Sequence, residues 1–487
     1  MNSSQLKNLL IGSVAALIAA CGGGGGGSVA DAGIGGSGIT SVGSVTAVGS
    51  ITVNGVKFDT QGATVTVDDA PGLESDLKVG LVTKTTGTLN NDRVTGKATR
   101  VEVDNELKGT VDSAPTITAT GGTFTVFGQV VVVDGNTVFG NATGLADLAP
   151  GTPVEVSGFR DTSGQVRATR VEKKAAVPAT IQVKGTLGNV NNGASTFTLG
   201  PLTVNFTGAQ RINFPTTGLA NGLFVEVKAA SLPSGGVLTA TSVEVRVVGL
   251  GQVSGEAEIE GFINGLSGSA PSFSFAVNGQ NVTTNASTAY DRGTSANLAN
   301  NIRVEVEGQV SNGTLVATKV KFEQENNDVK ITAQVTGKST SATNLTVFGV
   351  PGVTVKTDTS TTFQDNSSQQ LRIFGFADIQ VNDWLEIEAA KDSANSVTAS
   401  KVVRVNAPSN NRAILQGPAD SATALPNIVI LGVTGVTQTT TTFQDASGGG
   451  INQASFFGQV TVNRIVKMRG QFTGMQVNPV DEAQLEN

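Results

Sequence analysis

Leu148-Ala149-Pro150-Gly151-Thr152-Pro153-Val154-Glu155-Val156 is one of six stretches with the same spacing along the 487 residues of this chain. Its first, seventh and ninth positions are apolar, except that the first copy has threonine at the last two. Its fourth position is always glycine or asparagine, the residues that tolerate a positive φ most readily. The spacing predicts a one-turn helical or looped segment that ends in a left-handed residue, followed by a strand with its apolar face inward. The six copies span residues 77–85, 148–156, 219–227, 298–306, 379–387 and 460–468.

Two further phrases recur in each block. One alternates apolar residues into a glycine, as in Phe124-Thr125-Val126-Phe127-Gly128, and predicts a strand, a turn or bulge, and a second strand. The other is an Ala-Thr-Arg-Val strand, absent from the sixth block, whose basic residues we expect to point outward. It begins at Ala98, Ala168, Ala240, Ala317 and Ala399, at spacings of 70, 72, 77 and 82 residues. Its basic residues are Arg100, Arg170, Lys319 and Lys401.

Each block therefore holds about five short strands, the size of a closed OB-like barrel, which leaves no free sheet edge. A small sandwich is the alternative. The 61 glycines favour strands and tight turns, and no long amphipathic helical pattern is apparent. We predict an all-β chain with about six tandem OB-like five-stranded β-barrel units that pack end to end. The predicted units are 39–106, 107–174, 180–248, 252–323, 329–405 and a degenerate unit, 411–482, that ends in a polar tail.

Composition excludes several function classes. The chain has no histidine, which removes Ser-His-Asp and Cys-His catalysis and every histidine-containing metal site. Its net charge of −7 and the absence of a basic run make a nucleic-acid partner unfavourable. Nothing singles out a carboxylate pair for glycoside hydrolysis. We predict no enzyme activity, no catalytic residues, no cofactor and no metal.

The N-terminus resembles a bacterial lipoprotein signal. Lys7 precedes an apolar run too short to span a bilayer comfortably, and the run ends in Leu17-Ile18-Ala19-Ala20-Cys21, which is similar to a lipobox. The resemblance implies cleavage between Ala20 and Cys21 and acylation of Cys21, the single cysteine of the chain. Residues 1–20 would be the signal peptide and the Gly-rich residues 21–38 a flexible tether. Gly22 after the cysteine would favour transfer to the outer membrane in a Gram-negative cell.

The repeated blocks resemble a known family. The order Phe-x-Val-x-Gly, Leu-x-x-Gly-x-x-Val-x-Val and Ala-Thr-Arg-Val, after a lipobox and a Gly-rich tether, is similar to the bacterial domain of unknown function 5666. The resemblance covers nearly all of residues 39–482, is best over 151–171 and is poorest in the sixth block. It implies a secreted or lipid-anchored location and carries no established activity.

Few residues stand out as binding candidates. Tyr290 and Arg292 lie in a long loop of the fourth block and are the positions where we expect a binding pocket, if one exists. Asp68-Asp69 and Asp104-Asn105-Glu106 do not fit a calcium loop, and turn formation explains them. A glutamate also recurs beside the strand valines, where we expect the solvent face of an alternating strand. These glutamates are Glu155, Glu226, Glu305 and Glu386.

These observations lead to two hypotheses of function. The first is a non-catalytic envelope protein, attached to the membrane through its lipid anchor and facing the periplasm or cell surface, with a structural, adhesive or scaffolding role toward an envelope partner. The alternative is a binding protein for a small molecule or glycan, with its site in loops at the barrel mouths.

Overall fold

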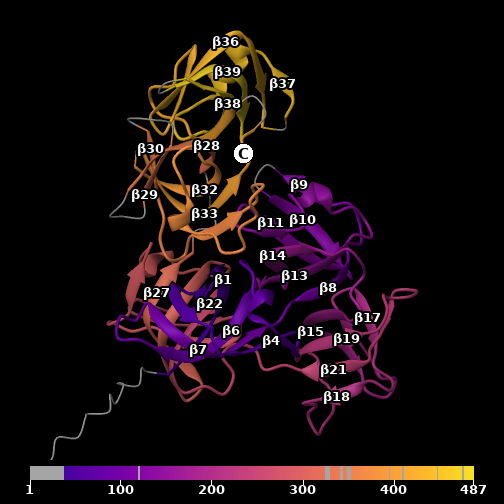
Figure 1. Ribbon diagram of the computed structural model, residues 1–487. Coiled ribbons are helices and arrows are strands. Elements are labelled where there is room, and N and C mark those ends of the chain that lie inside the picture. The colour runs from indigo at the N-terminus through magenta and orange to yellow at the C-terminus, as the bar shows by residue number, and fades with distance from the viewer. Residues whose placement is uncertain are drawn as a thin grey trace, which may run out of the picture. The chain divides into compact units, whose positions relative to one another are not determined.

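The computed structural model describes residues 38–118, 121–323, 329–339, 344–347, 352–393, 395–408, 411–446, 448–473 and 476–486 (Figure 1). These residues form an almost purely β structure, as predicted. The one α-helix of the described residues is α1 (Gln453–Gln459). No helix in this part of the chain is long and apolar enough to cross a membrane.

The first repeat folds as a closed barrel. It contains β1 (Gly38–Ala47), β2 (Ile51–Val53), β3 (Val56–Asp59), β4 (Thr64–Val67), β5 (Ala70–Gly72), the 3-10 helix η1 (Glu74–Asp76), β6 (Val82–Leu89) and β7 (Thr95–Val103). β1 pairs with β2 and β6, β2 with β3, β6 with β7, and β3 runs parallel to β7. The circuit β1–β2–β3–β7–β6–β1 confirms the OB-like five-stranded barrel and not the sandwich.

The fourth and fifth repeats close in the same order. The circuits are β22–β23–β24–β27–β26 and β28–β29–β30–β33–β32, each with one parallel pair, β24–β27 and β30–β33. The fourth repeat has β22 (Gly255–Ser269), β23 (Ser272–Val277), β24 (Gln280–Thr283), β25 (Ala289–Asp291), η3 (Ser295–Asn297), β26 (Arg303–Ser311) and β27 (Thr314–Phe322). The fifth has β28 (Val329–Lys338), β29 (Asn344–Val347), β30 (Val353–Lys356), β31 (Thr362–Asp365), η4 (Phe376–Asp378), β32 (Trp384–Ser393) and β33 (Ser396–Val405).

The second and third repeats vary this plan. The second has β8 (Leu107–Thr110), β9 (Thr116–Thr118), β10 (Gly121–Val126), β11 (Gln129–Asp134), β12 (Val138–Gly140), η2 (Leu145–Asp147), β13 (Pro153–Arg160) and β14 (Val166–Lys173). It closes through a single bridge, Val111 to Val126. The third has β15 (Ile181–Asn191), β16 (Thr196–Leu199), β17 (Leu202–Asn205), β18 (Gln210–Ile212), β19 (Phe224–Ala229), β20 (Val237–Thr239) and β21 (Ser242–Val245). Its last barrel strand is divided into β20 and β21.

The C-terminal segment also follows the barrel order. It has β34 (Arg412–Pro418), β35 (Asn427–Ile430), β36 (Val433–Gln444), β37 (Gly450–Ile451), α1, β38 (Ile465–Thr473) and β39 (Gln476–Leu485). The prediction of a polar tail is wrong, because β39 pairs with both β38 and β36. Val477, Val480, Ala483 and Leu485 bury their side chains, and the residues between them are polar apart from Pro479.

The recurring Gly or Asn has the predicted left-handed conformation in all six copies. The φ values are 85° at Gly80, 81° at Gly151, 89° at Gly222, 69° at Asn301, 78° at Asn382 and 68° at Asn463. A 3-10 helix precedes this residue in the first, second, fourth and fifth repeats, and α1 precedes it in the sixth. The turn reverses the chain so that the following strand lies beside the first strand of the same barrel.

A pair of backbone hydrogen bonds accompanies each of these turns. The N–H of the left-handed residue donates to a carbonyl of the first strand or of the residue just after it, and the N–H of that same residue donates back to the carbonyl of the residue that follows the left-handed one. The forward N···O distances are 2.7 Å (Gly80 to Val45), 2.8 Å (Gly151 to Val111), 2.9 Å (Gly222 to Leu187), 2.8 Å (Asn301 to Ile263), 2.9 Å (Asn382 to Val335) and 2.9 Å (Asn463 to Ala419). The return bonds are 2.8–2.9 Å long. We call these bonds the closure pair.

Sheets continue from one repeat to another. β8 joins β15, linking the second and third repeats, and β28 joins β34, linking the fifth repeat to the C-terminal one. The first repeat instead joins the fourth, because β1 runs parallel to β22 (Figure 1, indigo beside rose). Simple end-to-end packing of sequence neighbours was therefore a wrong expectation for the first repeat.

The left-handed turn yields a stability prediction. A Cβ at Gly151 would meet no atom within 4 Å, so a substitution there acts through the backbone alone. We expect Gly151→Val to lower the free energy of unfolding by about 1–2 kcal/mol, and Gly151→Asn by less than about 1 kcal/mol, because asparagine accepts this conformation. Denaturant unfolding of both variants tests this. Equal losses for Asn and Val would contradict the role assigned to the turn.

Candidate functional site

The recurring glutamates do not share one environment. Glu386 is exposed and Glu155 is half-buried, but Glu226 and Glu305 are only 2% and 4% exposed. The expectation of a common solvent face was therefore wrong at two of the four positions. Alternation along the strand correctly predicts that these side chains point away from the interior of their own barrel. It does not predict that another repeat covers this outer face.

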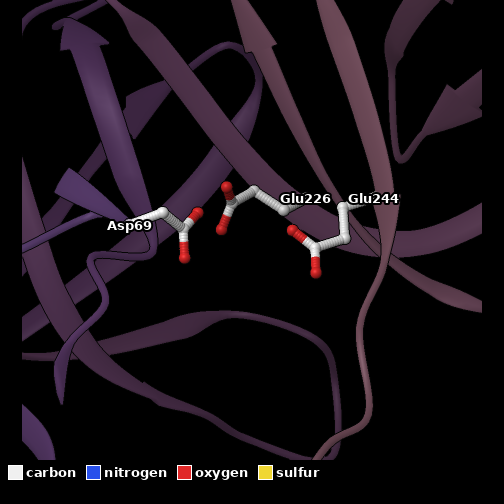
Figure 2. Close-up of side chains that lie close together, drawn as sticks. All are labelled: Asp69, Glu226 and Glu244. Atoms are coloured by element: carbon white, nitrogen blue, oxygen red, sulfur yellow. The ribbon is translucent and has the colours of Figure 1, made fainter. Parts of the chain in front are cut away.

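Glu226 belongs to a group that we call the charge cluster. Asp69 lies in the β4–β5 turn and Asp104 directly after β7, both in the first repeat. The other members, Lys184, Glu226, Lys228, Glu244 and Arg246, lie on or directly after β15, β19 and β21 of the third repeat. Figure 2 shows the carboxylates of Asp69, Glu226 and Glu244 directed toward a common space. One oxygen from each lies within 4.8 Å of the other two.

Three cations occupy the space among these carboxylates. Lys228 Nζ lies 2.7 Å from Asp69 and 3.1 Å from Glu226. Arg246 lies 3.1 Å from Glu244, 3.4 Å from Asp69 and 3.9 Å from Glu226, and it also pairs closely with Asp104. Lys184 pairs closely with Asp104 and lies 3.8 Å from Glu226. The cluster therefore joins the first and third repeats by ion pairs.

The carboxyls of the cluster differ in pKa. Burial, with a smaller effect of Asp104, raises the pKa of Glu226 to about 7. Burial acts in the same direction on Asp69, but the hydrogen bond from Lys228 and the charge of Arg246 hold its pKa below the usual value. Lys184 and Arg246 likewise overcome burial and lower the pKa of Asp104. Glu226 is thus the carboxyl that changes charge near neutral pH.

A metal ion does not suit this arrangement. Three converging carboxylates are a ligand set that Ca²⁺ accepts. Here Lys228 and Arg246 already neutralise them, and a divalent cation would have to displace both. Asp68 and Asp69 have φ values of 50° and 68° in a tight turn, as their turn role predicts. The Asp68 carboxylate accepts a hydrogen bond from the backbone N–H of Asn105 at 2.9 Å and pairs with Lys108 at 2.9 Å.

Two of the four basic residues of the Ala-Thr-Arg-Val strands, Arg170 and Lys401, contact other repeats. Arg170 was expected to point outward into solvent, yet it is 7% exposed. Its guanidinium donates to the Val79 carbonyl of the first repeat at 3.0 Å and pairs with Glu172 at 2.9 Å. Lys401 of the fifth repeat donates to the Thr137 carbonyl of the second at 3.0 Å. Arg100 is exposed, as predicted.

The two binding candidates of the fourth repeat have separate surroundings. Tyr290, on β25, stacks on Phe322 with ring centroids 6.5 Å apart, and its buried hydroxyl has no hydrogen-bond partner among the described residues. Arg292 pairs closely with Asp358 and donates to Ser360 at 2.9 Å, both in the fifth repeat. Arg292 thus serves a contact between repeats. Ala20 and Cys21 lie outside the described residues.

The larger hollows lie between repeats, while the barrel interiors are packed with apolar side chains such as Phe58, Phe197 and Phe206. One hollow of about 590 Å³ is bordered by the first, second and fifth repeats. Arg170, Glu172 and Asp365 are its buried charged residues, and Phe139, Gln370 and Arg372 also line it. A second, of about 390 Å³, adjoins the charge cluster.

Tandem five-stranded barrels, joined by sheets that continue between repeats and by charged groups on their outer faces, define the structural class of this protein. The family model described as "Domain of unknown function (DUF5666)" matches residues 39–102, 108–172, 179–244, 260–321 and 334–403. The chain belongs to this family, and the matches confirm the resemblance over the first five blocks, up to residue 403.

Other comparisons add little. Among solved structures, a chain titled "drosophila Unr CSD456" matches at 14% sequence identity and a TM-score of 0.12, covering 46% of this chain and 96% of its own length. That likeness carries no functional argument. No curated protein matches this chain.

The charge cluster yields a second stability prediction. Arg246→Met should leave the four carboxylates of the charge cluster with only two cations, Lys184 and Lys228. These carboxylates are Asp69, Asp104, Glu226 and Glu244. Since Arg246 is partly buried, we expect a loss of roughly 2–3 kcal/mol in unfolding free energy, between the values for exposed and buried pairs. Arg100→Met, which breaks the exposed pair with Glu102, should cost at most about 1 kcal/mol. Denaturant titrations compare the two, and equal small losses would show that the cluster does not hold the repeats.

Proposed function

We propose that this protein is a lipid-anchored, non-catalytic component of the bacterial cell envelope, with a structural, adhesive or scaffolding role. The supporting observation is the use of its polar side chains. Charged groups on the outer faces of the barrels, including those of Lys228, Arg246, Arg170 and Arg292, bind neighbouring repeats. Apolar side chains fill the interiors. Side chains that could perform chemistry are thus engaged in holding an array together.

The absence of histidine from the sequence agrees with this proposal, because the usual general base is missing. The lipobox at Leu17–Cys21 supports the anchor. Each buried CH₂ of an acyl chain contributes about 0.8 kcal/mol, so the several chains of a mature lipoprotein would hold the protein firmly in a membrane. The tether at 21–38 would let the array reach an envelope partner in the periplasm or at the cell surface.

The anchor is tested by metabolic labelling with an alkyne-modified fatty acid in a Gram-negative host. The wild type should carry the label and sediment with outer-membrane fractions, and Cys21→Ser should carry none. The double variant Cys21→Ser, Gly27→Cys keeps one cysteine outside the lipobox position and should also remain unlabelled. Label on either variant, or an unlabelled wild type, would contradict lipid attachment at Cys21.

A second candidate function is the binding of a small molecule or glycan. The hollow of about 590 Å³ favours it, because its volume is within the range of small-molecule sites. Arg372 on its border donates to the carbonyls of Glu74 and Leu77 and has no ion pair among the described residues. Screening with soluble oligosaccharides would favour this candidate if one raised the thermal midpoint of the wild type but not that of Gln370→Ala.

A further inference from the structure

The contact between the first and fourth repeats contains an unusual carboxyl. Ile39–Val42 of β1 pair in parallel with Glu256–Ile259 of β22, and we call this contact the β1–β22 seam. On its other edge β22 pairs with β26, where Glu258 lies directly opposite Glu307 and Glu260 opposite Glu305. Four glutamates therefore stand together beside the seam.

Three of these four glutamates have a cation partner. Glu260 binds Arg303 at 2.5 Å, Glu305 binds Lys321 at 2.9 Å, and Glu307 binds Lys319 at 2.7 Å. Glu258 is 6% exposed and has no ion pair among the described residues. Its hydrogen-bond donor is the Ser41 hydroxyl of β1, at 2.9 Å. That hydroxyl in turn accepts from the Asn54 amide at 3.0 Å.

The surroundings of Glu258 favour its neutral form. β26 presents the carboxylates of Glu305 and Glu307, β27 presents the ammonium of Lys319, which is bound to Glu307, and β1 presents the uncharged Ser41. A buried carboxylate that faces like charge and lacks its own cation is costly. We propose that Glu258 makes the β1–β22 seam sensitive to pH, so that the seam is firm while Glu258 holds a proton and loosens as it ionises.

The direction of the effect follows from linkage. Burial, and then the charges of Glu305 and Glu307, raise the pKa of Glu258 to about 8 from its ordinary 4.5. Opening of the seam exposes the carboxyl to water and returns the pKa toward that ordinary value, so opening releases a proton between these two pH values. The stabilisation is complete below pH 4.5 and is lost as the pH rises through about 8. The opening constant should rise about tenfold per pH unit in this window and then level off.

Hydrogen exchange of the full chain between pH 6 and 9 tests this proposal. Peptides that contain the seam residues of β1 are followed by mass spectrometry and corrected for the intrinsic pH dependence of exchange. In the wild type, the opening constant should rise about tenfold per pH unit up to about pH 8. Glu258→Gln, which keeps the size and hydrogen-bonding capacity of the side chain, should lose that rise.

Glu307→Gln is the matched control. It leaves Glu258 in place and removes one like charge, so the rise should persist and level off at a lower pH. Burial also raises the pKa of Glu305 to about 7. Any contribution of Glu305 to the pH dependence of opening is present in all three proteins and cancels in the comparison. An unchanged rise in Glu258→Gln would overturn the proposal. If Glu258→Gln does not fold, the wild type alone decides. An opening constant that does not change between pH 6 and 8, after correction for intrinsic exchange, also overturns the proposal.

Discussion

Each barrel depends on the closure pair, two short backbone hydrogen bonds that attach the first strand, or the residue just after it, to the turn before the fourth barrel strand. The bonds form because one residue, glycine or asparagine, adopts a positive φ and directs its N–H back toward the first strand. A residue with a branched side chain would be strained there. With the first strand held, the third and last strands run parallel and close the circuit, and no interior sheet edge is left unpaired.

The barrels associate in two ways: sheets continue between repeats at β1–β22, β8–β15 and β28–β34, and charged side chains on the outer faces bind other repeats. Arg246, Lys184 and Lys228 bind carboxylates of two repeats, and Arg170 reaches a carbonyl of the first repeat. Removing one partner of such a buried pair leaves an uncompensated charge, so these contacts favour the observed arrangement of the repeats. Burial at these contacts, with a smaller effect of neighbouring carboxylates, also raises the pKa values of two individual carboxyls, Glu226 and Glu258. The array is therefore specific in its contacts, and the proposal for Glu258 adds a response to pH at the β1–β22 seam.

Sequence reasoning succeeded where the information is local. The Gly or Asn position predicted a left-handed turn and the structure has one in all six copies, and strand alternation predicted which valines are buried. It failed where two distant segments meet. Nothing near Glu226 indicates that Asp69 and Asp104 approach it, and nothing in β1 indicates a parallel partner at β22 instead of the next repeat. Alternating charge on β19, Glu226 followed by Lys228, was a usable signal for an ionic contact face, but not for its partner.

The most direct test of this account is the hydrogen exchange of six backbone amides, those of Gly80, Gly151, Gly222, Asn301, Asn382 and Asn463, resolved by NMR on the full chain. If the closure pair holds every barrel, all six N–H groups should exchange slowly, with protection comparable to that of the central strand amides. Fast exchange at these positions, with protected strands around them, would show that the barrels close without this pair and would contradict the account.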